Sequence, residues 1–287
     1  MKIWITGAKG QVGSVLLDLL RNMQIEHIGT TRQQVELGNE KQVMAHMTNF
    51  TGITHVIHTA GFTNVEAAEI QKDEAYLSNV IATCHLAKAA SIHGAKLFYI
   101  STDYVFDGTK KTAYQENDPT NPLNWYGMTK RDDELCVQES GNYCIIRTSR
   151  IFGGLGREYV ASLLRLMRHE KELHFASDQI SRPTYVVDFA KALLFLVTND
   201  ASGIYHYANQ GTINKYEFAS LIWKAAKQKN IPMACAALLP ILTSHWQGSA
   251  KRPLNTVLDT SKIEQLLSIP SWQDSFEPYL QSLLSTD

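Results

Sequence analysis

A glycine-rich turn near the N-terminus constrains the fold of this chain more than any other feature. The sequence TGAKGQVG occupies residues 6–13 and follows an apolar run at residues 2–6 that predicts a buried strand. The spacing of apolar side chains over residues 11–23 predicts a helix that begins within the turn. A strand, a turn of regularly spaced glycines and a helix in this order are typical of the first unit of a dinucleotide-binding sheet.

The three glycines have separate expected roles. Gly7 allows a tight turn, Gly10 lets the backbone approach a pyrophosphate, and Gly13 lets the helix pack closely on the strand. The N–H groups and the dipole at the start of the helix favour phosphate. We therefore expect a cofactor to bind along the turn, at Gly7, Gly10, Gln11, Val12 and Gly13. An ordinary glycine-rich turn is the alternative.

The N-terminal half continues as an alternation of predicted strands and helices. We expect strands at residues 25–30, 55–59, 96–101 and 143–147, and helices at residues 40–50, 66–93 (with a break near Lys72) and 125–139. This alternation predicts an α/β fold with a Rossmann-type doubly wound parallel sheet. Ligands of such sheets bind at the carboxyl ends of the strands.

Beyond residue 150 the pattern is less regular. We expect helices at residues 159–170, 187–198, 215–229 and 260–267, and short strands at residues 173–175 and 204–207. Residues 1–150 are expected to form an NADP(H)-binding Rossmann domain. Residues 151–287 are expected to form mainly a smaller, mixed α/β substrate-binding region, with segments that return to the main sheet.

Charge and composition exclude several classes of partner. The formal net charge is -1 and no basic run is present, so we expect binding neither to nucleic acid nor to a membrane surface. A predicted strand begins at Lys2 and no apolar stretch is long enough to cross a bilayer, so we expect a cytoplasmic protein without a signal peptide. The cysteines form no C-x-x-C pair, and we expect reduced thiols and no metal site at Cys84, Cys136, Cys144 and Cys235.

A tyrosine and a lysine four residues apart indicate the chemistry. Tyr126 and Lys130 lie on one face of a predicted helix, where a fixed positive charge favours ionisation of a phenol. Thr102 follows the predicted strand at residues 96–101 and can place a hydroxyl against a substrate carbonyl oxygen. We expect these three residues to be catalytic, with Tyr126 protonating the carbonyl oxygen as hydride arrives from a nicotinamide cofactor. Lys130 is expected to lower the pKa of Tyr126 and to bind the nicotinamide ribose.

The ends of two other strands bear on the cofactor. Thr31 and Arg32 stand where NAD-binding chains have a carboxylate for the ribose hydroxyl, and Arg32 can instead pair with a 2′-phosphate. We therefore predict NADPH, with NADH possible, and the alternative is that Arg32 is a solvated loop charge. Ala60 and Gly61 follow another strand and are expected to contact the cofactor.

Three polar residues are candidates for substrate contact. Asp103 can bind a sugar hydroxyl, although a local turn contact fits it equally well. Arg252 can meet a diphosphate as a bidentate donor, and Asn255 can contact the substrate or a neighbouring loop. Without a family resemblance, the segment that holds Arg252 and Asn255 is better interpreted as a surface turn than as a binding site.

Longer segments carry a family resemblance over nearly the whole chain. They are STDYVFDG at residues 101–108, NWYGMTK at 124–130, DQ at 178–179 with PT at 183–184, and RPLNTVLD at 252–259. The chain resembles the extended short-chain dehydrogenase/reductases and, within them, the dTDP-4-dehydrorhamnose reductases. The resemblance implies a catalytic set of Thr102, Tyr126 and Lys130. It also implies that Thr63 and Val65 approach the sugar, with Thr63 near the cofactor as well.

The resemblance further implies a reaction. NADPH would reduce the 4-keto group of dTDP-4-dehydro-L-rhamnose to give dTDP-L-rhamnose, the last step in making an activated sugar for surface polysaccharides. Family dimers can share a metal through interface glutamates. This chain has Val15 at the helix position where such a glutamate would be expected, so no metal is predicted. A monomer or a homodimer is expected.

Three arginines depart from the family pattern. Arg150 stands where the family usually has a tryptophan that packs on the sugar, and Arg157 and Arg182 also replace other residue types. One hypothesis is a different sugar, either a related 4-keto-6-deoxy sugar or a more acidic one, bound through Arg150 and Arg182. The alternative is that these arginines pair with local carboxylates such as Glu158 and leave the substrate unchanged.

Other functions remain possible within the same superfamily. A dehydratase usually has an Asp-Glu pair after the threonine, whereas this chain has Asp103 and Tyr104. An epimerase would normally retain NAD. A non-catalytic regulatory subunit, like the β subunit of methionine adenosyltransferase, also resembles this family, but here the threonine, tyrosine and lysine are all present.

Overall fold

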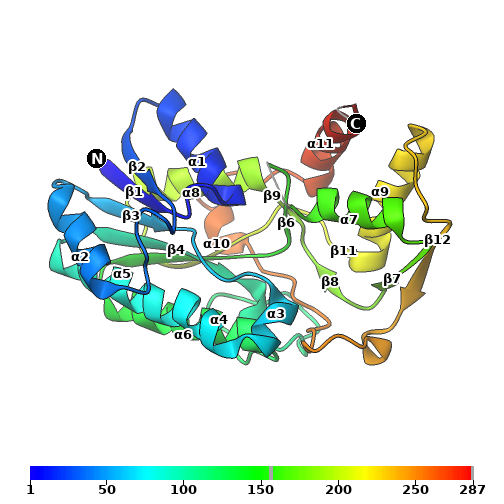
Figure 1. The fold of residues 1–287 in the computed structure, drawn as a ribbon, viewed down its shortest axis with the longest axis horizontal. Coiled ribbons are helices and arrows are strands. Elements are labelled where there is room, and N and C mark those ends of the chain that lie inside the picture. The colour runs from blue at the N-terminus through cyan, green and yellow to red at the C-terminus, as the bar shows by residue number, and fades with distance from the viewer. Residues whose placement is uncertain (155–157, 286–287) are drawn as a thin grey trace.

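A six-stranded sheet forms the centre of the larger lobe. The structure is a computed structural model that describes residues 1–154 and 158–285. The strand order is β10-β5-β4-β3-β1-β2, and every neighbouring pair is parallel (Figure 1). The strands are β1 (Lys2–Thr6), β2 (Glu26–Thr30), β3 (His55–His58), β4 (Lys96–Thr102), β5 (Tyr143–Thr148) and β10 (Gly203–Tyr207). The predicted α/β fold with a doubly wound parallel sheet is confirmed.

Helices cover both faces of this sheet because its strands are apolar on both sides. Ile3 and Ile5 of β1 pack with α1 (Gln11–Asn22) and α8 (Val186–Thr198) on one face. Trp4, between them, points to the opposite face. The helices on that face are α2 (Glu40–Asn49), α5 (Ala82–Ile92) and α6 (Trp125–Glu139).

The long helix expected at residues 66–93 is divided. It comprises α3 (Val65–Ile70), α4 (Lys72–Tyr76), a π-helical turn (Leu77–Ile81) and α5, so the predicted break near Lys72 is confirmed. The π-helical turn carries buried Asn79, whose side chain accepts from Phe62 N at 2.6 Å and donates to Thr129 Oγ1 at 2.8 Å. This residue therefore joins the loop after β3 to the helix that carries Tyr126.

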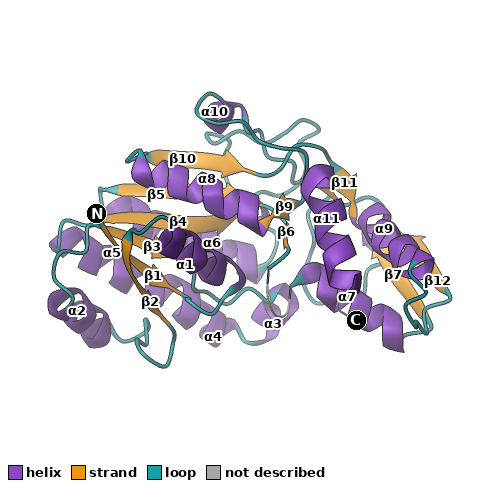
Figure 2. Ribbon diagram, turned by 90° about the horizontal axis from the view of Figure 1, so that it is seen from above, coloured by secondary structure: helices purple, strands orange, loops and turns teal. Residues whose placement is uncertain are grey.

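A smaller lobe contains most of the C-terminal half (Figure 2). Its elements are α7 (Tyr159–His169), β7 (Glu172–Ala176), α9 (Lys215–Gln228), β12 (Ala237–Ile241) and α11 (Trp272–Ser285). These elements surround an aromatic core in which Phe152, Phe218 and Phe276 pack together. The sequence patterns did not predict β12 or α11, and α11 contains Pro278.

Short segments connect the two lobes. The pairs are β6 (Ile151–Phe152) with β9 (Thr184–Tyr185), and β8 (Ile180–Ser181) with β11 (Ile213–Asn214). The chain returns from β9 through α8 to β10, which pairs with β5 in the main sheet. The helix expected at residues 260–267 is shorter, α10 (Ser261–Glu264).

One expectation about the cysteines is wrong. Cys84 of α5 and Cys136 of α6 form a disulfide, with their Cα atoms 5.0 Å apart. The spacing in the sequence could not indicate this pair, because it depends on two helices that pack side by side. Cys144 and Cys235 are free and buried.

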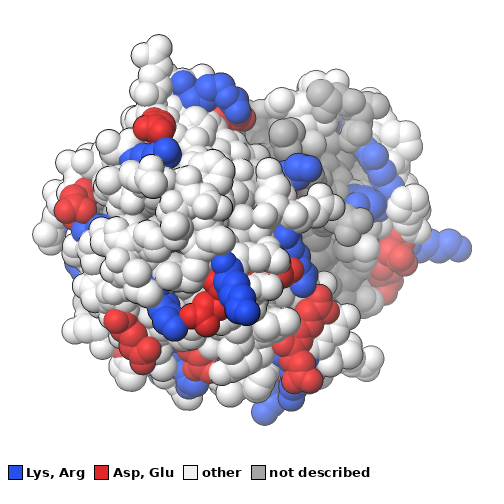
Figure 3. All heavy atoms as spheres, turned by 60° about the vertical axis from the view of Figure 1, so that its left-hand side comes forward, with Lys and Arg blue, Asp and Glu red and all other residues white. Residues whose placement is uncertain are grey.

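The surface shows no strong charge segregation where it can be seen. On the face shown in Figure 3, Lys and Arg side chains are interspersed with Asp and Glu. None of the helices in the described ranges is long and apolar enough to cross a membrane. Within those same ranges, no three His, Cys, Asp or Glu side chains are grouped so that they could hold a metal ion.

Candidate active site

The glycine-rich turn forms a close junction between β1, α1 and β3. Gly7 has a positive φ of 69°, and a Cβ there would lie 2.8 Å from Ala60 N. A Cβ at Gly13 would lie 2.3 Å from Gly7 O. Gly10 is the N-cap of α1 and provides no side-chain cap, so the helix N-terminus is lined by backbone. This backbone cradle fits the pyrophosphate of a nicotinamide dinucleotide.

The other residues expected near the cofactor have structural contacts as well. Gln11 Nε2 donates to Gly153 O at 2.7 Å. The side chain of Val12, the second residue of α1, is buried in the core. Ala60 N lies 3.4 Å from Thr6 Oγ1, and Gly61 is exposed. Gln11 thus connects the start of α1 to the loop that follows β6.

A carboxylate that the sequence reasoning missed lies beside Arg32. Arg32 Nε is 2.7 Å from Glu36 Oε2, and the arginine side chain is 65% exposed. Thr31 Oγ1 donates to Gln34 Oε1 at 3.0 Å. The guanidinium of Arg32 is therefore accessible just after β2, and Glu36 partly neutralises its charge.

The structure brings Thr102 and Tyr126 together. Thr102 ends β4 and Tyr126 lies in the first turn of α6, where the two side chains share a hydrogen bond. The helix is capped by Asn124, whose side chain accepts from Gly127 N at 2.8 Å. A Cβ at Gly127 would lie 2.3 Å from Tyr104 O, so this glycine allows α6 to start close to the turn after β4.

Lys130 lies on the same helix but faces other groups. Its Nζ donates to Ile100 O at 2.9 Å, lies 3.5 Å from Asp133 Oδ2, and is 4.1 Å from the centre of the Tyr99 ring. Burial raises the pKa of Tyr126, and the hydrogen bond to Thr102 opposes this rise. Lys130 is not among the main influences on this pKa, so the structure does not show the lowering that was expected from Lys130.

Asp133 is a buried member of the site that the sequence reasoning missed. Burial raises the pKa of Asp133 to about 6, against the opposing influence of Lys130. Burial also lowers the pKa of Lys130, against the opposing influence of Asp133. The i,i+3 spacing of these two residues on a helix was the signal that could have identified the pair.

A second phenol, Tyr104, lies edge-on to Tyr126 with ring centres 6.2 Å apart. Arg252 Nη1 donates to the Tyr104 hydroxyl at 3.3 Å, and Arg252 Nη2 lies 2.5 Å from Glu66 Oε1. Lys215, the first residue of α9, also bonds the Tyr104 hydroxyl. Burial alone would raise the pKa of Tyr104, but Lys215 and Arg252 outweigh it and lower that pKa.

Arg252, which was predicted to contact the substrate, belongs to this cluster. The sequence reasoning missed Lys215. A single lysine at the start of a helix carries no distinctive sequence signal. Glu66 belongs to the segment that the resemblance aligned with sugar contacts, but no role was predicted for it. Of the two residues expected there, Thr63 is exposed and Val65 begins α3.

Asp103 is buried among hydroxyl donors. Ser149 Oγ donates to Asp103 Oδ2 at 2.7 Å and Thr102 Oγ1 donates to Oδ1 at 3.1 Å. Burial raises the pKa of Asp103, although these hydroxyl groups and Arg150 oppose the rise. Asp103 thus fixes the end of β4 next to Thr102, which agrees with the local contact considered from the sequence.

The three unusual arginines have different surroundings. Arg150 adopts a positive φ of 37° directly after Ser149, close to Asp103. Arg182 Nη1 donates to Thr260 Oγ1 at 2.9 Å, and among the described residues it shares no hydrogen bond with the Tyr126 cluster. Arg157 lies outside the described residues. Of the two arginines that the structure describes, Arg150 is the one that lies beside the candidate catalytic groups.

Asn255 was predicted to contact either the substrate or a neighbouring loop. In the structure it contacts a neighbouring loop. Its Nδ2 donates to Lys110 O at 2.8 Å, and it borders a cavity of about 510 Å³. This cavity is also lined by residues 108–113 and by Asp178.

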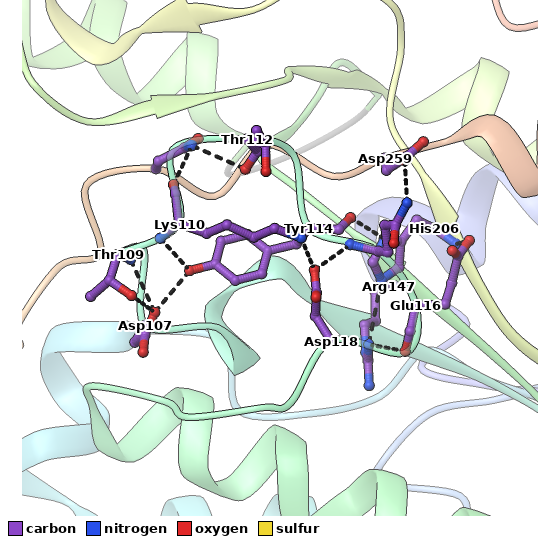
Figure 4. A network of polar contacts seen from close by, with 12 residues as sticks. Asp107, Thr109, Lys110, Thr112, Tyr114, Glu116, Asp118, Arg147, His206 and Asp259 are labelled. Atoms are coloured by element: carbon purple, nitrogen blue, oxygen red, sulfur yellow. Dashed lines mark hydrogen bonds and ion pairs between the residues drawn. The ribbon is translucent and has the colours of Figure 1, made fainter.

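Polar contacts hold the loop that leads to α6 (Figure 4). Arg147 Nη1 donates to Glu116 O at 3.2 Å, and His206 Nδ1 lies 3.0 Å from Tyr114 O. Arg147 also forms a buried two-point ion pair with Glu134 of α6, at 2.7 and 2.9 Å. These contacts anchor residues 107–118 to β5 and β10, and so position the start of α6.

The fold and the site together define an NAD(P)H-dependent oxidoreductase. Comparison with known proteins specifies the family, because the model of the RmlD substrate binding domain matches residues 1–285. The chain belongs to this family.

Individual relatives cover nearly the whole chain. The dTDP-4-dehydrorhamnose reductase of Aggregatibacter actinomycetemcomitans is 36% identical over 286 residues, covering 95% of this chain and 96% of that protein. The spore coat polysaccharide biosynthesis protein SpsK of Bacillus subtilis (strain 168) is 34% identical, covering 98% and 97%. The crystal structure of dTDP-4-dehydrorhamnose reductase from Bacillus anthracis str. Ames, in complex with NADP, matches with a TM-score of 0.89 and 32% identity, covering 98% and 100%.

Proposed function

We propose that this chain reduces the 4-keto group of a nucleotide-linked 6-deoxy sugar with NADPH. The reaction that fits best converts dTDP-4-dehydro-L-rhamnose to dTDP-L-rhamnose. The observation that carries the proposal is the hydrogen bond between Thr102 and Tyr126, at the carboxyl end of the same sheet as the glycine cradle. The NADP complex of a relative and the reductase names of several relatives support it.

The proposed cofactor site uses the backbone of the turn at Gly7, Gly10 and Gly13. Gln11, Val12, Ala60, Gly61 and Thr63 complete it, and Thr31 and Arg32 lie at the adenosine end. A bound nicotinamide dinucleotide supplies the hydride that adds to the carbonyl carbon. The exposed guanidinium of Arg32 favours a cofactor with a 2′-phosphate, although Glu36 shares its charge.

Proton transfer is assigned to Tyr126. Its pKa lies above the ordinary value because of burial, so the phenol is protonated at neutral pH and can donate to the developing alkoxide. The carbonyl carbon gains the hydride and its oxygen gains the phenolic proton, which balances the reduction to an alcohol. We assign Thr102 Oγ1 to hold the same oxygen by a hydrogen bond.

Lys130 and Asp133 have supporting roles in this proposal. We assign Lys130 to the cofactor ribose. Asp133 keeps the ammonium group of Lys130 in place at 3.5 Å. Substrate contacts are assigned to Thr63, Val65, Asp103 and Arg252.

Two broader proposals follow for the chain. Residues 1–150 hold mainly the cofactor and residues 151–287 hold mainly the sugar nucleotide, and the active unit is a monomer or a homodimer. Asn255 supports the site through its loop contact, and Arg182 through its contact with Thr260.

The proposal is tested by turnover of a defined substrate. Purified protein is mixed with NADPH and dTDP-4-dehydrorhamnose, and NADPH oxidation is followed together with the sugar product by mass spectrometry and NMR. We expect NADPH oxidation that requires the keto sugar and yields dTDP-L-rhamnose, with dTDP-glucose as an inactive control. Binding of NADPH without oxidation by any nucleotide 4-keto sugar would contradict the proposal.

A further inference from the structure

Arg150 is held in an unusual backbone conformation beside the proposed catalytic groups. Its φ of 37° lies in the left-handed region, which is rare for residues other than glycine and is often found at functional sites. The preceding residue, Ser149, bonds Asp103, and the carbonyl of Arg150 accepts from Thr184 N at 3.1 Å. The backbone is therefore fixed on both sides of the residue.

Among the residues that the structure describes, no carboxylate forms an ion pair with the half-buried Arg150. Among the described residues, its buried Nη1 has no hydrogen-bond partner. Glu158, the local carboxylate considered from the sequence, instead caps α7 by accepting from Val160 N at 2.9 Å and also accepts from Gly153 N at 3.2 Å. The alternative that Glu158 neutralises Arg150 is therefore not supported.

Lys215 adds a second positive charge close to Arg150. Burial lowers the pKa of Lys215. Tyr104 opposes this shift, whereas Arg252 and Arg150 add to it because like charges are close. Arg252 is already paired with Glu66 at 2.5 Å. Asp103 is close enough to Arg150 to feel its charge, but it already accepts from the hydroxyls of Ser149 and Thr102. The cluster thus has more positive charge than its own carboxylates balance.

We infer that Arg150 and Lys215 form an oxyanion-binding subsite that receives an anionic group of the substrate beside Tyr104 and Tyr126. The group is either a diphosphate oxygen or a carboxylate on the sugar, since a planar guanidinium binds both in the same way. This inference rests on the proposed function for the identity of the pocket, because Tyr104 contacts the proposed proton donor Tyr126.

Binding measurements with four probes test the subsite. The full chain is titrated calorimetrically with dTDP, thymidine, UDP-glucuronate and UDP-glucose, as wild type and as Arg150→Met and Lys215→Met. We expect each variant to bind at least one anionic probe about tenfold more weakly or worse, because a lost charged hydrogen bond costs that much affinity. Arg165→Met and Lys227→Met, which remove exposed charges from α7 and α9, serve as matched controls.

The pattern of loss identifies the anion. A loss for dTDP but not for thymidine assigns the subsite to the diphosphate. A loss confined to UDP-glucuronate, with UDP-glucose unaffected, assigns it to a sugar carboxylate. Arg150→Lys should recover part of the affinity in either case. If both methionine variants bind all four probes as tightly as wild type and controls, the inference is overturned.

Further readouts separate this inference from the proposed function. Thermal unfolding and NADPH affinity should be unchanged in the variants, which shows that they are folded. A wild-type chain that reduces no keto sugar but shows anion binding dependent on Arg150 would refute the function and retain the subsite. Normal turnover, combined with unchanged affinities in both variants, would retain the function and refute the subsite.

Discussion

Lys130 Nζ lies 3.5 Å from Asp133 Oδ2, and both side chains are buried one turn apart on α6. Through this contact, the ammonium group faces Asp133, Tyr99 and the carbonyl of Ile100 instead of the phenol of Tyr126. Burial raises the pKa of Tyr126, the bond to Thr102 opposes this rise, and the nearby Asp103 and Asp133 add to it. A phenol that remains protonated suits reduction, in which the tyrosine must give up a proton.

Replacing Tyr126 with phenylalanine should abolish most of the turnover without loss of the cofactor. We expect kcat to fall by about 100-fold or more, because general acid catalysis contributes at least that factor. The dissociation constant for NADPH should change little, which fluorescence titration can measure. Tyr143→Phe, at the start of β5 and away from the site, is the matched control. A Tyr126→Phe protein with full activity would show that another group donates the proton.

Adding a methyl group at Gly13 should weaken cofactor binding. An alanine Cβ there would lie 2.3 Å from the backbone oxygen of Gly7, so the turn must shift. We expect the affinity for NADPH to fall by about tenfold or more, on the order of a lost pair of phosphate contacts. Gly38→Ala is the control, because its Cβ would meet the ends of two side chains, Leu77 at 3.3 Å and Glu36 at 3.5 Å, and no backbone atom within 4 Å is among its three nearest neighbours. Equal NADPH affinity in the Gly13→Ala and wild-type proteins would argue against a cofactor cradle.

The pair Arg32 and Glu36 should set the choice between NADPH and NADH. Removing the guanidinium in Arg32→Ala should raise the KM for NADPH by about tenfold and leave that for NADH nearly unchanged, because only NADPH has the 2′-phosphate. Glu36→Gln should have the opposite effect on NADPH, since it frees Arg32 from its partner at 2.7 Å.

Steady-state kinetics with both cofactors measures this preference. Arg21→Ala is the matched control, because Arg21 is equally exposed and pairs with Asp18 at 2.8 Å. An Arg32→Ala protein that loses affinity for the two cofactors equally would place the arginine elsewhere in the site.

The buried His206 should make the protein sensitive to acid. Burial, together with Arg147, lowers the pKa of His206 from 6.5 to about 3, so the folded state holds it neutral. Between pH 6.5 and about 3, the unfolded state binds one more proton than the folded state. The free energy of unfolding therefore decreases as the pH falls through this window, by about 1.4 kcal/mol per pH unit for this group.

Urea unfolding at several pH values measures this slope. The slope should be smaller in His206→Gln, while His174→Gln, at an exposed position, should keep the wild-type slope. His58 is also buried with its pKa lowered to about 3, so part of the acid sensitivity should remain in His206→Gln. An unchanged slope in that variant would show that His206 is not neutral in the folded state.

Much of the larger lobe was predictable because its signals are local. The turn at residues 6–13, the apolar strands and the break near Lys72 depend on the spacing of neighbouring residues. The smaller lobe was less predictable. Helix α11 contains Pro278 and is stabilised by burying Trp272, Phe276 and Leu280 against other elements. Such contacts between distant segments leave a weaker pattern in the chain.

By itself, the sequence determined the order of strands and helices in the larger lobe, the glycine turn, and the residue types needed for carbonyl reduction. Only the tertiary structure decided which charges meet: Lys130 with Asp133, Arg32 with Glu36, and Lys215 with Arg150 and Arg252. The physical reason is that charge interactions fall off with distance and depend on burial. Both quantities are set when separate segments pack, and neither can be read from spacing along the chain.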